Sequence, residues 1–241
     1  MCGRMNISDH EGIREFLANL ELPLEWSVPN QLAETQELSV GYNVAPASKI
    51  EVIHTIDKKI QQSIMQWGIK PTWQASKKNK LPAMLLYARA ETVWQKKSFS
   101  KLIASQRIVI PVNGFYEWRR DPENMKQPFY FSPQGAKVCL LAGLFTITAD
   151  GDYQCCVLTN KAGDLMSPVH HRSPVIISSE SLPTWLCNDE PAVLDRIMNT
   201  SHENLLDVIE VSSYVNNTRH EGATCIKPQT AGNEPRQTKL F

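Results

Sequence analysis

Residues 107–120 read RIVIPVNGFYEWRR, and this stretch decides the fold class because branched and aromatic side chains of this kind favour β-strands. A hydrophilic run, RDPENMKQ at 120–127, separates it from the apolar PFYFS at 128–132, which predicts a hairpin with a long loop. Two more strand-like runs follow, KVCLLAGLFTIT at 137–148 and YQCCVLTN at 153–160. The centre of the chain is therefore expected to form a largely antiparallel sheet.

Strand and helix patterns flank this centre on both sides. The further strands are expected at KIEVIHTI (49–56), QSIMQWGI (62–69), SPVIIS (173–178) and LLDVIEVS (205–212). The helices are expected within DHEGIREFLANLEL (9–22), WQKKSFSKLIAS (94–105), LPTWLC (182–187) and EPAVLDRIMN (190–199). Because strands and helices do not alternate regularly, the pattern predicts an α+β fold.

No internal repeat and no interior linker divide the chain. We therefore expect one domain over residues 1–228. Residues 229–241 are polar and proline-containing, and are expected to form a flexible tail.

The charge balance argues against binding of polyanions through overall charge. Lys and Arg number 25, Asp and Glu number 25, and the formal net charge is zero, so any nucleic-acid site must be a local basic patch. The first thirty residues lack a basic region followed by an apolar core, and no run reaches the roughly 18 apolar residues of a membrane span. We expect a cytoplasmic protein with no membrane partner.

Six cysteines are present, and none forms a C-x-x-C pair. Cys139, Cys155 and Cys156 lie in apolar runs and are expected to pack as small hydrophobic residues in a reducing compartment.

Cys2 becomes the first residue if Met1 is removed. An N-terminal amine has an ordinary pKa of about 7.7–8.0 and a cysteine thiol one near 8.5, so both are usable nucleophiles near neutral pH. The amine condenses with an aldehyde to an imine, and the thiol on the adjacent carbon closes on that imine to give a thiazolidine. The alternative is a frayed terminus with an incidental cysteine.

Glu117 lies among Phe115, Tyr116 and Trp118. A carboxyl group in partly dry, aromatic surroundings has a raised pKa, which suits a general acid and base near neutrality. Strand alternation favours the alternative, in which Glu117 faces solvent because it is out of phase with Tyr116 and Trp118.

MSPVHHRSP at 166–174 sets two histidines and an arginine between prolines. His170 and Arg172 are candidates for a proton-handling imidazole beside a phosphate anchor, and a structural or exposed histidine pair is the alternative. No further ligands at metal spacing accompany them.

Seven motifs, in order along the chain, resemble those of the SOS-response-associated peptidase (SRAP) family of abasic-site processing proteins. They are MCGR (1–4), GYNVAPAS (41–48), QWGIKPTW (66–73), ARAET (88–92), NGFYEW (113–118), VHHRSP (169–174) and VSSYVNN (211–217). The resemblance runs from Met1 to about Pro228. It implies an SRAP-like domain with a largely antiparallel, barrel-like sheet flanked by helices.

The resemblance implies that the chain binds single-stranded DNA and caps abasic sites. SRAP proteins form a thiazolidine with the ring-opened sugar aldehyde, free their own Cys2 by removing Met1, and in some members cleave the strand as a lyase. The resemblance implies Cys2 as nucleophile, Glu117 as the acid and base for ring opening and imine formation, and His170 as the group that positions and protonates the sugar. We expect no metal, no cofactor, a monomer, and association with the nucleoid when DNA is bound.

The matched motifs also supply expected DNA contacts. Arg4, Asn43, Arg89 and Arg172 are expected to hold phosphates without reading sequence. Trp73 is expected either to stack on a base beside the lesion or to pack in the core. Tyr87 stands where family members commonly have Asn in N-A-R-x-E-T. Its phenol can donate a hydrogen bond to the opened sugar, but its bulk is expected to slow or reshape capture.

The tail carries a separate hypothesis. QTKLF at 237–241 resembles the peptide by which bacterial repair and replication proteins bind the sliding clamp, with Gln237, Leu240 and Phe241 as anchors. Tethering of this kind raises the local concentration at a fork. An incidental Leu-Phe in a disordered tail is the alternative.

Two other functions stay open. MCG also begins class II glutamine amidotransferases, which would make the chain an N-terminal-cysteine amidohydrolase, but NGFYEW matches their N-G-E-I-Y-N motif poorly. A module that binds single-stranded or modified DNA without covalent chemistry would use the same basic groove.

Overall fold

The computed structural model describes residues 3–20, 25–26, 38–56, 59–71 and 83–229. Its helices are α1 (His10–Ala18), α2 (Ser100–Ser105), α3 (Leu182–Cys187) and α4 (Pro191–Asn199), with 3-10 turns η2 (Ala90–Thr92), η3 (Glu203–Leu205), η4 (Ser213–Asn216) and η5 (Ala223–Ile226). Its strands are β1 (Arg4–Asn6), β2 (Glu25–Trp26), β3 (Lys49–Ile56), β4 (Lys59–Trp67), β5 (Tyr87–Arg89), β6 (Arg107–Val112), β7 (Gly114–Arg120), β8 (Lys126–Pro133), β9 (Cys139–Ile147), β10 (Tyr153–Lys161), β11 (Arg172–Pro174), β12 (Ile176–Ile177) and β13 (Leu206–Glu210).

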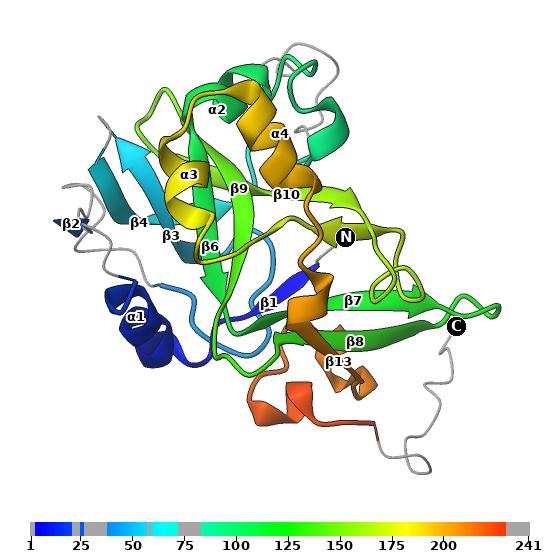
Figure 1. Ribbon diagram of the computed structural model, residues 1–241. Helices are drawn as coiled ribbons and strands as arrows, with labels where there is room; N and C mark the ends of the chain where they lie inside the picture. Colours follow the sequence, from blue (N-terminus) through cyan, green and yellow to red (C-terminus); the bar gives the residue numbers. More distant parts are fainter. Residues whose placement is uncertain (1–2, 21–24, 27–37, 57–58, 72–82, 230–241) are drawn as a thin grey trace.

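These elements form two sheets, which confirms the α+β prediction. The smaller sheet has the order β1-β7-β8-β13, and the larger one follows β11-β10-β4-β3-β6-β9-β12. An additional pairing of β10 with β9 makes the larger sheet partly ring-like. Most pairings are antiparallel, but β10 runs parallel to both β4 and β5, and β2 runs parallel to β4. In Figure 1 the smaller sheet lies below the larger one, and α2 and α4 lie at the opposite end of the molecule.

The two sheets meet at Asn113, between β6 and β7. The Asn113 N–H donates to the Asn6 carbonyl (2.8 Å), its side-chain oxygen accepts from the Asp9 N–H (2.9 Å), and its amide donates to the Lys137 carbonyl (3.0 Å). The next residue, Gly114, has no room for a side chain, because a Cβ there would lie 2.5 Å from the Phe131 carbonyl oxygen. The run 107–120 is therefore two strands in two sheets, and β7 enters the smaller sheet in a fixed position.

Local sequence explains the helices. At α1, the Asp9 side chain accepts from the Gly12 N–H (2.9 Å), and Ile13 and Leu17 are buried on one face. At α4, Pro191 occupies the first turn. The helix expected over 94–105 begins only at Ser100, since residues 94–99 form turns.

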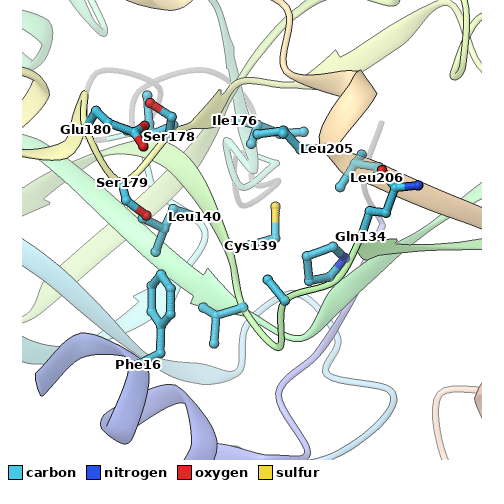
Figure 2. A pocket seen from close by; sticks show the side chains of 14 residues that line it. Phe16, Gln134, Cys139, Leu140, Ile176, Ser178, Ser179, Glu180, Leu205 and Leu206 are labelled. Carbon is cyan, nitrogen blue, oxygen red and sulfur yellow. The ribbon is translucent and has the colours of Figure 1, made fainter. Parts of the chain in front are cut away.

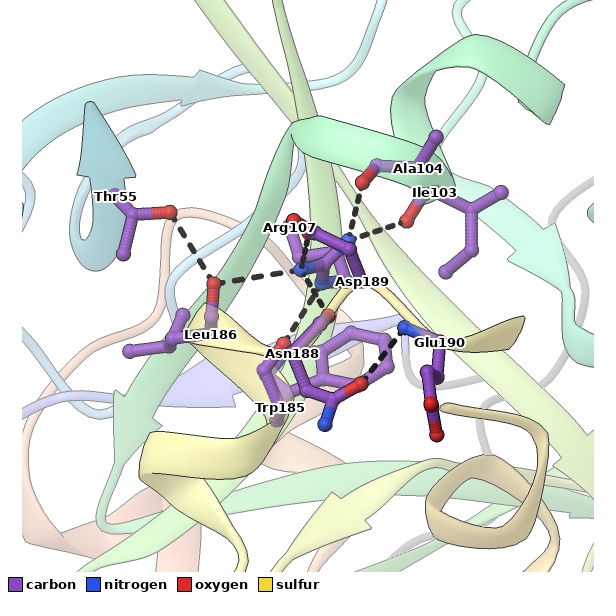
Figure 3. Close-up of polar contacts among 9 residues, drawn as sticks. All are labelled: Thr55, Ile103, Ala104, Arg107, Trp185, Leu186, Asn188, Asp189 and Glu190. Carbon is purple, nitrogen blue, oxygen red and sulfur yellow. Dashed lines mark hydrogen bonds and ion pairs between the residues drawn. The ribbon is translucent and has the colours of Figure 1, made fainter. Parts of the chain in front are cut away.

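Arg107 of β6 attaches two helix ends to the larger sheet. Its guanidinium is 3% exposed and donates to carbonyls at the C-terminal ends of α2 and α3, as Figure 3 shows. The acceptors are Ile103 (2.8 Å), Ala104 (2.6 Å), Trp185 (2.7 Å), Leu186 (3.4 Å) and Asn188 (2.7 Å). One buried cation thus satisfies carbonyls that a helix leaves without intrahelical partners.

The predicted packing of Cys139, Cys155 and Cys156 as small hydrophobic residues is confirmed, because all three are buried in the main core. Burial raises the pKa of the Cys139 thiol to about 12. Among the described residues, no helix has the length and apolar character that a membrane span requires.

Candidate functional site

Glu117 and His170 come together from different parts of the chain. Glu117 lies on β7 and is 1% exposed, while His170 lies near the end of the connection between β10 and β11. The His170 Nδ1 lies 3.9 Å from the Glu117 Oε1. The structure therefore places the expected acid and base beside the expected imidazole.

Both faces of β7 are covered, and this explains the burial of Glu117. Phe115 belongs to the main core and stacks on Phe131 with ring centroids 5.3 Å apart, whereas Tyr116 belongs to a second cluster with Tyr130. Alternation places Glu117 on the Phe115 side. The expectation that this side faces solvent is wrong, because the main core lies there.

Burial raises the pKa of the Glu117 carboxyl to about 7. Near neutral pH, comparable fractions of the group are protonated and ionised. Such a carboxyl can act as proton donor in one step and as acceptor in the next.

His170 is held by the residues that follow it. The His170 Nδ1 lies 3.0 Å from the Arg172 backbone nitrogen and 3.2 Å from the Arg172 carbonyl oxygen, so the backbone of Arg172 fixes this side of the ring. Burial lowers the pKa of His170, and the nearby charges of His171 and Arg172 act in the same direction. The Nε2 side of the ring faces away from these backbone contacts.

Arg4 of β1 and Asn43 form a second part of the site. The Arg4 Nη1 donates to the Asn43 Oδ1 (2.7 Å), and the guanidinium lies 5.8 Å from the centre of the Trp118 ring. The Asn43 side chain is 3% exposed, and its amide donates to the carbonyls of Asn217 (2.9 Å) and His220 (2.9 Å). Through these contacts Asn43 fixes the Arg4 guanidinium and the segment around η4.

Arg172 and Arg89 share a neighbour, Thr159 of β10. Arg89 pairs with Thr159 in the sheet, and the Arg172 Nη2 donates to the Thr159 carbonyl (2.6 Å). Arg172 is 8% exposed and binds Glu91 through both carboxylate oxygens (2.5 and 2.9 Å), whereas Arg89 is exposed. Glu91 lies inside ARAET, but only the fold shows that it holds Arg172.

Tyr87, at the start of β5, is half-buried. Its ring meets the ring of Trp67 edge to face, with centroids 6.5 Å apart. This aromatic contact accounts for a large side chain at the position.

Several predicted residues lie outside the described residues: Cys2, Trp73, Gln237, Leu240 and Phe241. So does the predicted tail, except Gln229. Within the described ranges, no group of three or more His, Cys, Asp or Glu side chains is arranged to hold a metal ion.

A cavity of about 240 Å³ lies elsewhere in the molecule, and Figure 2 shows its lining side chains, among them Phe16, Cys139 and Leu205. None of the predicted site residues that the structure describes lines it.

Comparison with known proteins places the chain among relatives. The family model described as SOS response associated peptidase (SRAP) matches residues 1–218. The abasic site processing protein YoqW of Bacillus subtilis (strain 168) is 30% identical over 234 residues, covering 94% of this chain and 99% of that protein. YedK of Escherichia coli (strain K12), also named an abasic site processing protein, is 26% identical, covering 95% and 100%. HMCES of Pongo abelii, which has the same descriptive name, is 26% identical, covering 85% and 68%.

Solved structures show the same fold. A protein from Bacteroides thetaiotaomicron superposes with a TM-score of 0.76 at 20% identity, covering 95% of this chain and all of that one. A phage-related protein from Bordetella bronchiseptica superposes with a TM-score of 0.64 at 24% identity, covering 87% and 94%.

Proposed function

Since this chain belongs to the SOS response associated peptidase (SRAP) family, we propose that it captures abasic sites in single-stranded DNA covalently, through a thiazolidine formed by Cys2 after removal of Met1. The observation that supports this most is the position of the Glu117–His170 pair, 3.9 Å apart, beside the strand that follows the N-terminus.

The register of β1 with β7 leads the chain toward this pair. Arg4 pairs with Tyr116 and Met5 with Phe115 in antiparallel order, so the chain before Arg4 runs in the direction of Glu117. Gly3 is the residue before Arg4, and the Cα of its covalent neighbour Cys2 is limited to about 3.8 Å from that of Gly3. An N-terminal nucleophile near Glu117 is consistent with this tether.

The chemistry needs a group that both gives and takes protons. Sugar ring opening removes the proton of the C1′ hydroxyl and protonates the ring oxygen, which yields the aldehyde. The Cys2 amine adds to the aldehyde carbon and water leaves, giving an imine. The thiol sulfur then adds to the imine carbon while its proton goes to nitrogen. A carboxyl with a pKa of about 7 suits these alternating transfers, and the Nε2 of His170, on the side of the ring away from Arg172, suits a contact with the sugar oxygen.

Arginine side chains supply the proposed phosphate contacts. Arg89 is exposed, and Arg4 lies over Trp118. The Arg172 guanidinium is paired with the Glu91 carboxylate. Any contact of Arg172 with DNA is therefore assigned in addition to this ion pair. Asn43 acts on DNA through Arg4, which its side chain holds. The contact of Tyr87 with the opened sugar and the stacking of Trp73 on a base rest on the resemblance alone.

Three further parts of the proposal rest on resemblance: removal of Met1 by the protein itself, strand cleavage as a lyase, and clamp binding by Gln237, Leu240 and Phe241. The last is tested by pull-down with the sliding clamp. A Leu240→Ala/Phe241→Ala variant that binds as well as the wild type contradicts it.

Covalent capture is tested by mixing the protein with a single-stranded oligonucleotide that carries one abasic site and running a denaturing gel. We expect a shifted band for the wild type and for Cys187→Ala, which removes an exposed thiol that has no neighbouring amine. We expect none for Cys2→Ala. Binding in a native gel without a denaturation-resistant band would leave a non-covalent DNA-binding module, and glutaminase activity would favour the amidohydrolase.

A further inference from the structure

Glu203 of η3 binds the backbone of the connection that carries His170. Its side chain is 6% exposed. The carboxylate accepts from the N–H groups of Gly163 (2.7 Å), Leu165 (3.1 Å) and Met166 (3.1 Å). Three hydrogen bonds to one buried anion are charge-assisted and fix the shape of residues 163–166.

Met166 passes this constraint on to His170. Its carbonyl oxygen accepts from the N–H groups of Val169 (2.9 Å) and His170 (2.9 Å). Its sulfur accepts from the Ser173 hydroxyl (3.3 Å), on the far side of His170 in the chain. Met166 is therefore fixed by Glu203 through its N–H group and fixes the His170 backbone through its carbonyl oxygen.

Gly163 shows how closely the carboxylate approaches this segment. A Cβ at Gly163 would lie 2.9 Å from the Glu203 Oε2 and 3.3 Å from its Oε1. A side chain there would therefore push away a carboxylate that three hydrogen bonds hold in place. An alanine at position 163 would therefore disturb the contact between Glu203 and the connection.

We propose that Glu203 is a positioning residue, which sets the imidazole of His170 against Glu117 through Met166. This rests on the function proposed above for His170. Glu203 itself lies outside the Glu117–His170 pair and acts only through the backbone. Its loss should move the ring without removing any group that takes part in the chemistry.

The test compares Glu203→Leu, Glu203→Gln and Gly163→Ala with the wild type. The control is Glu15→Gln, on the exposed side of α1. NMR titration of the six histidines follows His170 in the protein without DNA, and a His170→Gln spectrum assigns its signal. The rate of cross-linking to abasic DNA is measured against pH in the same variants. Glu117, His171 and Arg172, the charged groups that face the ring among the described residues, are unchanged throughout.

We expect Glu203→Leu and Gly163→Ala to slow cross-linking about ten- to hundredfold, as small misplacements of catalytic groups do. The titration of His170 should move toward higher pH as its burial decreases. Glu203→Gln keeps one acceptor oxygen, so its rate of cross-linking should lie between those of Glu203→Leu and the wild type.

A folded Glu203→Leu protein in which the His170 titration is unchanged overturns the proposal, even if the rate falls. If Glu203→Leu does not fold, Gly163→Ala decides in the same way, because it displaces the carboxylate without removing it. The titration needs no DNA, so a wild type that forms no adduct contradicts the proposed function and leaves this test intact.

Discussion

Glu117 is a residue whose proposed role in catalysis opposes its effect on stability. Its pKa is raised from an ordinary value of 4.5 to about 7 by burial. Between these values the folded protein keeps a proton that the unfolded chain releases. The free energy of unfolding from this group therefore falls as pH rises from about 4.5 to 7, and stays lower above that window.

Replacing Glu117 with Gln should remove this pH-dependent fall in the free energy of unfolding. At pH 8 we expect the free energy of unfolding to rise by up to about 3 kcal/mol, with little change at pH 4. The same variant should slow cross-linking by about 10²- to 10⁴-fold, the usual contribution of general acid–base catalysis. Denaturant unfolding at both pH values measures the effect on stability. The same difference in the free energy of unfolding between the variant and the wild type at pH 4 and at pH 8 would contradict the raised pKa of Glu117.

Tyr87 should respond differently to substitution. Tyr87→Asn removes an edge-to-face contact with Trp67 and should lower the free energy of unfolding by about 1 kcal/mol or more. It also removes bulk from the position expected to meet the sugar, so cross-linking should become several-fold faster. Tyr87→Phe, which keeps the ring, serves as control for stability. A slower Tyr87→Asn enzyme would show that the phenol assists capture.

Arg107 decides how two helices are attached to β6. Arg107→Met should lower the free energy of unfolding by at least about 3 kcal/mol, because it leaves several buried carbonyls without donors. Asp189, whose side chain is 77% exposed, is a weak partner of the same guanidinium. Asp189→Asn should therefore cost about 1 kcal/mol or less. Equal losses in the two variants, measured by urea unfolding, would contradict this account.

Individual elements follow from the sequence better than their pairing does. The strands β3 and β10 and the helices α1 and α3 lie where their patterns predict. The break at Asn113 was not predicted, because a run of apolar residues does not reveal where its partner strands change. The parallel pairing of β10 with β4 depends equally on contacts between distant segments.

For the whole molecule, the resemblance of seven motifs predicted the family and the meeting of Glu117 with His170. It did not predict that Asn43 is buried and saturated with hydrogen bonds, or that Arg172 is paired with Glu91. A motif lists residue types in order, whereas these pairings join segments that are far apart in the chain. Glu203 lies outside every motif, and only its contacts reveal it.

The central claim is that one residue, Cys2, supplies both bonds to the lesion. It is tested most directly by mass spectrometry of the protein alone and after reaction with abasic DNA followed by nuclease digestion. The account predicts a protein lacking Met1, and an N-terminal peptide whose Cys2 carries the sugar on both its nitrogen and its sulfur with loss of one water. Retained Met1 in a protein that still forms the adduct, or an adduct on any other residue, would contradict it.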